Sequence, residues 1–173
     1  TVALDQEGGR VQRLRDPWTE WPPMRTLGGR PVEDTARFAK ALALELLDAG
    51  FDLDFAPVVD VDSNPQNPVI GDRSFAREPG VVGAPAAAQI EAMQALGIAA
   101  CAKHFPGHGD TASDSHLDLP VLSHSRERLE QVEFAPFREA IAAGVDSVMT
   151  AHLLLPLLDP EQPATLSSIV LTD

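Results

Sequence analysis

Apolar residues recur at helical spacing in several segments of the chain, and short apolar runs separate these segments. From Glu33 to Ala49 the apolar positions form one face of a helix, which we expect to pack inward. Further helical segments are predicted at 84–96, 127–134 and 136–144. Short apolar runs predict four strands, at residues 1–4, 51–59, 98–102 and 145–150.

Three glycines set the order of these elements. Gly50, Gly97 and Gly144 are equally spaced, and each ends a helix and is followed at once by a strand. Repeated alternation of helix and buried strand is typical of a parallel sheet with helices outside it, so the predicted fold class is α/β. Four strands that each deliver polar residues to one rim favour a (β/α)8 TIM barrel over an open doubly wound sheet.

The length of the chain changes this picture. A complete barrel needs roughly 250 residues, and about half of its strands can be counted here. We therefore expect residues 1–173 to be part of a single barrel domain that lacks N-terminal and C-terminal strands. The chain also opens directly on an apparent strand, which suggests that further residues precede it.

The composition is that of an ordinary folded domain with an acidic surface. Hydrophobic residues make up 44% of the chain, and the net charge is −13. This charge argues against nucleic acid or an anionic membrane as a partner, because either requires clustered lysine and arginine. The lone Cys101 lies in an apolar run and is expected to be a buried small hydrophobe. No transmembrane span or signal peptide is visible, and we expect a cytoplasmic monomer.

The segment 103–116 concentrates reactive side chains. It holds three of the five histidines and one of the two lysines, in a stretch that proline and glycine keep irregular. His108 can simply hydrogen-bond the loop together. Lys103 and His104 are either a solvated strand exit or ligand contacts.

Asp114 and His116 are candidates of another kind. In an extended loop, residues two apart can point the same way, so a carboxylate can hold an imidazole in one tautomer and raise its basicity. Spacing alone leaves two interpretations open, a proton-transfer pair and a solvated polar loop.

Charged side chains also accompany the other strands. Asp5 follows buried apolar residues directly, and a carboxylate there needs partners. Arg13 can reach the oxygens of a ligand or pair on the surface with Glu7 or Asp16. Arg73 taken alone is typical of a surface ion pair.

The predicted sheet brings several of these side chains to one place. Asp60 can be a ligand or a loop cap, and capping is the favoured interpretation. In parallel α/β folds the ligand site lies beyond the carboxyl ends of the strands. Four of the polar residues fall there: Asp5, Asp60, His104 and His152.

Three separated motifs resemble one enzyme family. They are the segments 5–13, 71–75 and 103–109, the last followed by Asp114-Ser115-His116. Together they resemble the glycoside hydrolase family 3 β-N-acetylhexosaminidases of the NagZ type. The resemblance implies a retaining β-N-acetylglucosaminidase that removes terminal N-acetylglucosamine from cell-wall (peptidoglycan) fragments, without a metal or cofactor.

The resemblance also implies roles for individual residues. Asp5 corresponds to an aspartate that binds the sugar, and His116 corresponds to an unusual acid/base with Asp114 as its partner. The nucleophile of the family is an aspartate after a later strand, which is expected beyond Asp173. Contacts to the sugar ring are implied for four residues: Arg13, Arg73, Lys103 and His104.

Two other functions stay open at this point. The cluster of His104, His108, Asp114 and His116 has the residue types that bind zinc or manganese, which would make the protein a metal-dependent hydrolase. The expected absence of the nucleophile instead suggests a noncatalytic sugar-binding fragment.

Overall fold

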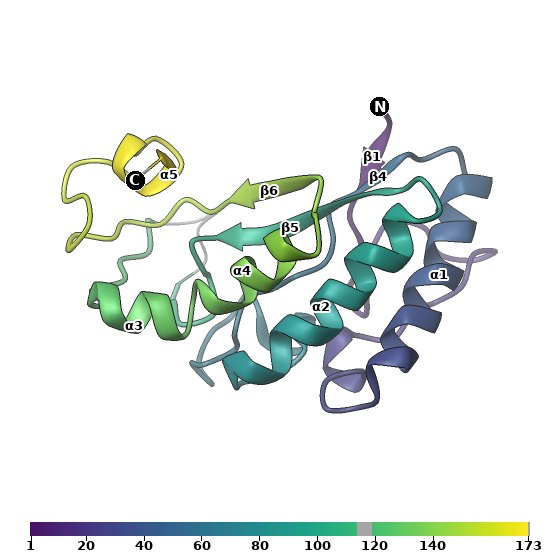
Figure 1. The fold of residues 1–173 in the computed structure, drawn as a ribbon, viewed down its shortest axis with the longest axis horizontal. Helices are drawn as coiled ribbons and strands as arrows, with labels where there is room; N and C mark the ends of the chain where they lie inside the picture. The colour runs from purple at the N-terminus through teal and green to yellow at the C-terminus, as the bar shows by residue number, and fades with distance from the viewer. Residues whose placement is uncertain (114–118, 173) are drawn as a thin grey trace.

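The computed structural model describes residues 1–113 and 119–172 and contains one parallel sheet of four strands. The four strands lie in the sheet in the same order as in the chain, so the sheet has no switch point (Figure 1). This order matches part of a (β/α)8 barrel, so the predicted α/β fold class is confirmed. The strands, in sheet order, are β1 (Ala3–Leu4), β4 (Leu53–Asp54), β5 (Ala99–Phe105) and β6 (Ser147–Thr150).

The longer helices cover one side of this sheet. Figure 1 shows α1, α2 and α4 side by side, and α1 packs on α2 as α2 packs on α4. None of the helices in the described part of the chain is long and apolar enough to cross a membrane. The helices are α1 (Val32–Asp48), α2 (Pro79–Gln94), α3 (Arg126–Gln131), α4 (Ala135–Ala142) and α5 (Ser168–Thr172).

The main core lies between these helices and the sheet. The apolar face of α1 buries Leu42 and Leu46 completely, as the helical spacing predicts. These side chains join Ile90 and Met93 of α2 and Ala100 of β5 in one cluster. Burying a side chain of the Leu or Ile type contributes about 1.5–3 kcal/mol, so this cluster fixes the helices on the sheet. A second, smaller cluster contains Leu122, Leu129, Ala151, Leu153, Leu155 and Ala164.

The predicted helix stops are confirmed. Gly50, Gly97 and Gly144 have φ values of 87°, 92° and 76°, which a residue with a side chain rarely adopts. The strand around Cys101 is also confirmed, and this thiol is 3% exposed.

Three elements differ from the sequence expectations. The strand predicted at 51–59 pairs regularly only over Leu53–Asp54, because Pro57 has no N–H to donate to a ladder. Helix α2 begins at Pro79, five residues before the predicted start at 84, because proline suits the first turn of a helix. A hairpin of β2 (Gln6–Gly8) and β3 (Val11–Gln12) follows β1 and was not predicted.

Candidate active site

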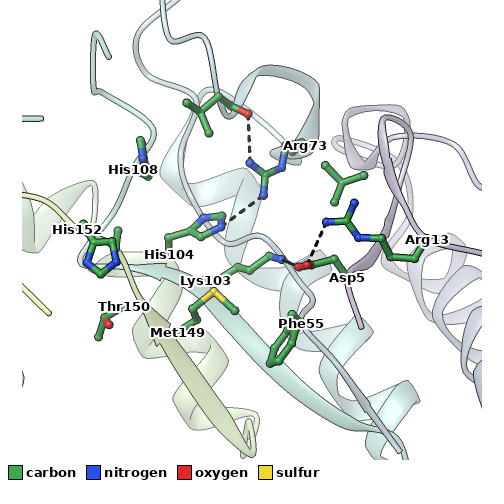
Figure 2. A pocket seen from close by; sticks show the side chains of 13 residues that line it. Asp5, Arg13, Phe55, Arg73, Lys103, His104, His108, Met149, Thr150 and His152 are labelled. Atoms are coloured by element: carbon green, nitrogen blue, oxygen red, sulfur yellow. Dashed lines mark hydrogen bonds and ion pairs between the residues drawn. The ribbon is translucent and has the colours of Figure 1, made fainter. Parts of the chain in front are cut away.

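A cavity of about 430 Å³ lies at the carboxyl ends of the parallel strands. Its lining comes from the carboxyl ends of β5 and β6 and from the segments that follow β1, β4, β5 and β6, which are far apart in the sequence, although the strands are adjacent in the sheet (Figure 2). All five described residues predicted to bind the sugar line this cleft: Asp5, Arg13, Arg73, Lys103 and His104.

Lys103 joins the strand end to the loop that follows β1. Its Nζ lies 2.7 Å from Asp5 Oδ1 and 2.6 Å from Glu7 Oε1. The side chain is 1% exposed, so the structure decides against a solvated strand exit. A buried ammonium between two carboxylates is compensated by charge and by hydrogen bonds. Lys103 therefore fixes the position of Asp5 in the cleft.

Asp5 presents its carboxylate to the cleft. The side chain is 31% exposed, and Arg13 Nη2 lies 3.5 Å from Asp5 Oδ2 (Figure 2). Burial alone would raise the pKa of Asp5, but the hydrogen bond and charge of Lys103, with those of Arg13, hold it below its ordinary value. Asp5 is therefore an ionised acceptor suited to hydroxyl groups.

Arg73 forms a bidentate ion pair with Glu7. Arg73 Nε and Nη2 donate to the two Glu7 oxygens at 2.8 Å each, and the Glu7 side chain is 1% exposed. The interpretation of Arg73 as a surface ion pair is therefore wrong. Burial would raise the pKa of Glu7, but the contacts to Arg73 and Lys103 lower it.

Glu7 is a site residue that the sequence reasoning missed. The sequence alone indicates Glu7 only as a surface partner for the arginines. One feature of the sequence does indicate Glu7, its position two residues after Asp5 at the end of a buried strand. An acidic residue at this position needs partners, as Asp5 does.

His104 is oriented by the buried Asp60. His104 Nδ1 lies 2.7 Å from Asp60 Oδ2, and its Nε2 lies 3.4 Å from Arg73 Nη2 (Figure 2). The guanidinium favours a lone pair on Nε2, which places the proton on Nδ1 as a donor to Asp60. Asp60 also accepts the backbone N–H of His108 at 2.6 Å, so it caps this loop as well. Burial raises the pKa of Asp60, and His104 and His108 lower it to a net value below the ordinary one.

His108 and His152 line the same cleft. His108 Nδ1 contacts Thr111 Oγ1 at 2.7 Å, in agreement with a role in bonding the loop together. Burial lowers the pKa of His108. His152 has an exposed ring whose Nδ1 lies 3.0 Å from Thr165 Oγ1.

Asp54 is a further buried carboxyl that the sequence analysis does not indicate. Asp54 in β4 is fully buried, and its Oδ1 accepts the backbone N–H of Gln6 at 2.9 Å. Burial raises the pKa of Asp54 to about 8, despite the hydrogen bond from Gln6 and the charge of Lys103.

The predicted acid/base pair and the predicted metal cluster are only partly visible. Asp114 and His116 lie outside the described residues, so their pairing and the four-residue metal set stay predictions. Within the described part of the chain, the acidic and histidine side chains close enough to hold a metal together form a different set: Asp110, His124 and Glu133.

The family of the chain follows from comparison with known proteins. The model of the glycosyl hydrolase family 3 N-terminal domain matches residues 1–173. The chain belongs to this family. Among curated relatives, a β-hexosaminidase of Nitrosomonas eutropha is 44% identical over 99% of this chain and 51% of its own length.

Solved structures of family 3 proteins share the fold. A β-N-acetylglucosaminidase from Paenibacillus sp. str. FPU-7 superposes with a TM-score of 0.93 at 47% identity, over 97% of this chain and 32% of that one. NagZ from Neisseria gonorrhoeae, in complex with N-trifluoroacetyl-D-glucosamine, gives a TM-score of 0.90 at 40% identity, over 97% of this chain and 51% of that one. This family 3 chain thus spans about half the length of the curated relatives it matches.

Proposed function

We propose that the chain forms the sugar-binding part of a retaining β-N-acetylglucosaminidase that acts on terminal N-acetylglucosamine. The observation that carries this proposal is the cleft in which Asp5, Arg73, Lys103 and His104 converge on one rim of the parallel sheet. Membership of glycosyl hydrolase family 3 and the β-hexosaminidase relatives support it.

The cleft has the chemistry to hold a sugar ring. Asp5 is an ionised acceptor for ring hydroxyls, and Arg13 and Arg73 supply guanidinium donors at the same rim. Lysine has three N–H donors, so Lys103 can serve Asp5, Glu7 and one hydroxyl together. Because ion pairs fix these groups before a ligand enters, little ordering cost is left for binding.

The proton transfer is assigned to Asp114 and His116 on the basis of the family resemblance. In the first step His116 donates a proton to the leaving oxygen while a carboxylate attacks the anomeric carbon. In the second step the same imidazole accepts a proton from the attacking water, and the sugar is released with retained configuration. Asp114 stabilises the charged imidazole in each cycle.

The attacking carboxylate is placed after Asp173 in this proposal. Among the described residues that line the cleft, Asp5 is the one carboxylate, and it is held between Lys103 and Arg13. A carboxylate fixed by two cations is suited to binding and is a poor nucleophile. A cell-wall peptidoglycan fragment is the proposed substrate, by resemblance to the NagZ type.

The cleft also favours one second candidate, a noncatalytic sugar-binding module. Both functions predict that residues 1–173 bind N-acetylglucosamine, and they differ in turnover by the full-length protein. We expect that protein to release p-nitrophenol from p-nitrophenyl N-acetyl-β-D-glucosaminide, and proton NMR to show the β-anomer as the first product. Binding without release would support the module, and an α-anomer as first product would exclude a retaining mechanism.

A further inference from the structure

Three potential metal ligands converge outside the cleft. Asp110 lies in the glycine-containing segment after β5, His124 precedes α3, and Glu133 follows α3. One ligand atom from each residue lies within 4.8 Å of the other two. Their distance in sequence shows that this grouping is a product of the fold.

One pair of atoms in this set is in contact without forming a regular hydrogen bond. His124 Nε2 lies 2.7 Å from Asp110 Oδ2. The same nitrogen is buried and has no hydrogen-bond partner of acceptable geometry among the described residues. Two atoms that each lie about 2.0–2.2 Å from a tetrahedral zinc ion are about 3.3–3.6 Å apart, so these two side chains need to separate by less than about 1 Å to admit the ion.

Glu133 provides a second, independent indication. Its side chain is 3% exposed, and its Oε2 has no hydrogen-bond partner in the described part of the chain. A buried carboxylate oxygen that lacks a partner is costly unless a proton or a cation occupies it.

Arg128 supplies part of the missing positive charge. Its Nη2 lies 3.1 Å from Glu133 Oε1 and 3.5 Å from Asp110 Oδ2. One guanidinium faces two carboxylates, so the ionised cluster keeps a net negative charge. Arg128 binds Glu133 through Oε1, which leaves Oε2 for another ligand.

We propose that Asp110, His124 and Glu133 bind a divalent zinc ion. Imidazole nitrogen and carboxylate oxygen both bind zinc, the imidazole of His124 favours zinc over magnesium or calcium, and a site with three protein ligands leaves one position for water. His124 and Asp110 are 21% and 22% exposed, so the ion has a route from solvent.

The position of this site indicates that the ion would link two segments of the chain. Asp110 belongs to the same loop as Gly107, and a Cβ built on Gly107 would lie 2.8 Å from Glu133 Cβ. The ion would therefore join the loop that follows Lys103 and His104 to the segment around α3. This inference does not rest on the proposed glycosidase function.

The experiment measures zinc binding directly, by calorimetric titration of the metal-free full-length protein and by the absorption spectrum of cobalt(II) in its place. We expect one zinc ion per chain with a Kd of about 10 µM or tighter. His124→Asn and Glu133→Gln should each weaken binding by tenfold or more, since even outer-shell changes cost about 10–100-fold. Glu127→Gln on the exposed side of α3 and His152→Asn in the cleft are matched controls, and both should bind as the unmodified protein does.

Three results would overturn the proposal. One is the absence of zinc binding at about 100 µM metal. Another is binding that survives both His124→Asn and Glu133→Gln. The third is binding that is lost on His116→Asn and kept in the other two variants, which would place the ion in the cleft. If Glu133→Gln does not fold, as judged by circular dichroism, the partly exposed His124→Asn and Asp110→Asn variants decide the question.

Discussion

Glu7 binds Arg73 through both carboxylate oxygens, with two N–H···O distances of 2.8 Å. The same carboxylate lies 2.6 Å from Lys103 Nζ, so one buried anion fixes two cations that line the cleft. Because Lys103 in turn fixes Asp5, Glu7 determines the geometry of this part of the cleft without lining the cleft itself.

Replacing this carboxylate should destabilise the fold. Glu7→Gln leaves Arg73 without an anionic partner and Lys103 with Asp5 alone. Breaking a buried ion pair by removing one partner costs about 3–5 kcal/mol, so we expect a loss of that size in the free energy of unfolding, measured with urea. Glu130→Gln is the matched control, because Glu130 pairs with the exposed Arg126 and Arg138, and such pairs contribute about 0–1 kcal/mol. Equal losses in the two variants would contradict the role of Glu7.

The Asp60–His104 contact makes a prediction about the tautomer of the imidazole. Nitrogen-15 NMR of the histidine side chains should show the His104 proton on Nδ1, and Asp60→Asn should change this signal. The variant should also weaken N-acetylglucosamine binding by tenfold or more, since a hydrogen bond to a charged group contributes about 1.5–3 kcal/mol. Asp72→Asn, at a half-exposed position beside Arg10, should leave both measurements unchanged. A His104 proton on Nε2 in the unmodified protein would contradict the assignment.

The sequence predicts the architecture well because its signals are local and repeated. The apolar face of α1 and the glycines at 50, 97 and 144 specify where helices end and strands begin, and the structure agrees. The hairpin after β1 was missed because its strands are two and three residues long, too short for an alternating pattern to appear.

The site is less predictable, because its energetics depend on pairs that are distant in sequence. The five residues predicted to contact the sugar are indicated by the family resemblance, and the residue types of the arginines and of Lys103 and His104 alone leave surface interpretations open. Glu7 and Arg73 are 66 residues apart, and Lys103 and Asp5 are 98 apart. No local pattern reports such contacts, so the partners of Arg73 and the burial of Lys103 required the structure.

The proposed acid/base role of His116 predicts a dependence on the leaving group. His116→Ala in the full-length protein should reduce turnover of substrates with poor leaving groups far more than that of activated aryl glycosides. An activated leaving group departs without a proton, so it does not need the acid. Steady-state kinetics on the two substrate classes measure this difference. An equal loss for both classes would contradict the role of His116 as acid.

The buried Asp54 predicts how stability changes with pH. Its pKa is about 8 in the folded protein and near the ordinary 3.8 when unfolded, so between these values the folded state holds a proton that the unfolded chain releases. Its contribution to stability is fully present below pH 3.8 and is lost as the pH rises toward about 8. Asp54→Asn should therefore gain stability relative to the unmodified protein between about pH 5 and pH 8.

Urea unfolding at the two pH values tests this expectation. Asp52→Asn is the matched control, since Asp52 lies two residues earlier and its side chain is 54% exposed. The control should differ from the unmodified protein by a similar amount at both pH values. A difference for Asp54→Asn that does not grow with pH would show that Asp54 is ionised in the folded protein. Asp5 and Glu7 act in the opposite sense, because their lowered pKa values give stability that is lost as the pH falls.

Two glycines without positive φ predict opposite effects of the same substitution. A Cβ built on Gly109 would lie 1.7 Å from the carbonyl oxygen of Val61, so Gly109→Ala forces the loop after β5 away from the backbone that follows β4. We expect a loss of about 1–3 kcal/mol in the free energy of unfolding, the usual cost of overpacking. Gly80 lies in the first turn of α2, and a Cβ there meets no atom within 4 Å. Gly80→Ala should be neutral or stabilise the protein by up to about 1 kcal/mol. A Gly109→Ala protein as stable as Gly80→Ala would show that this loop does not pack against Val61.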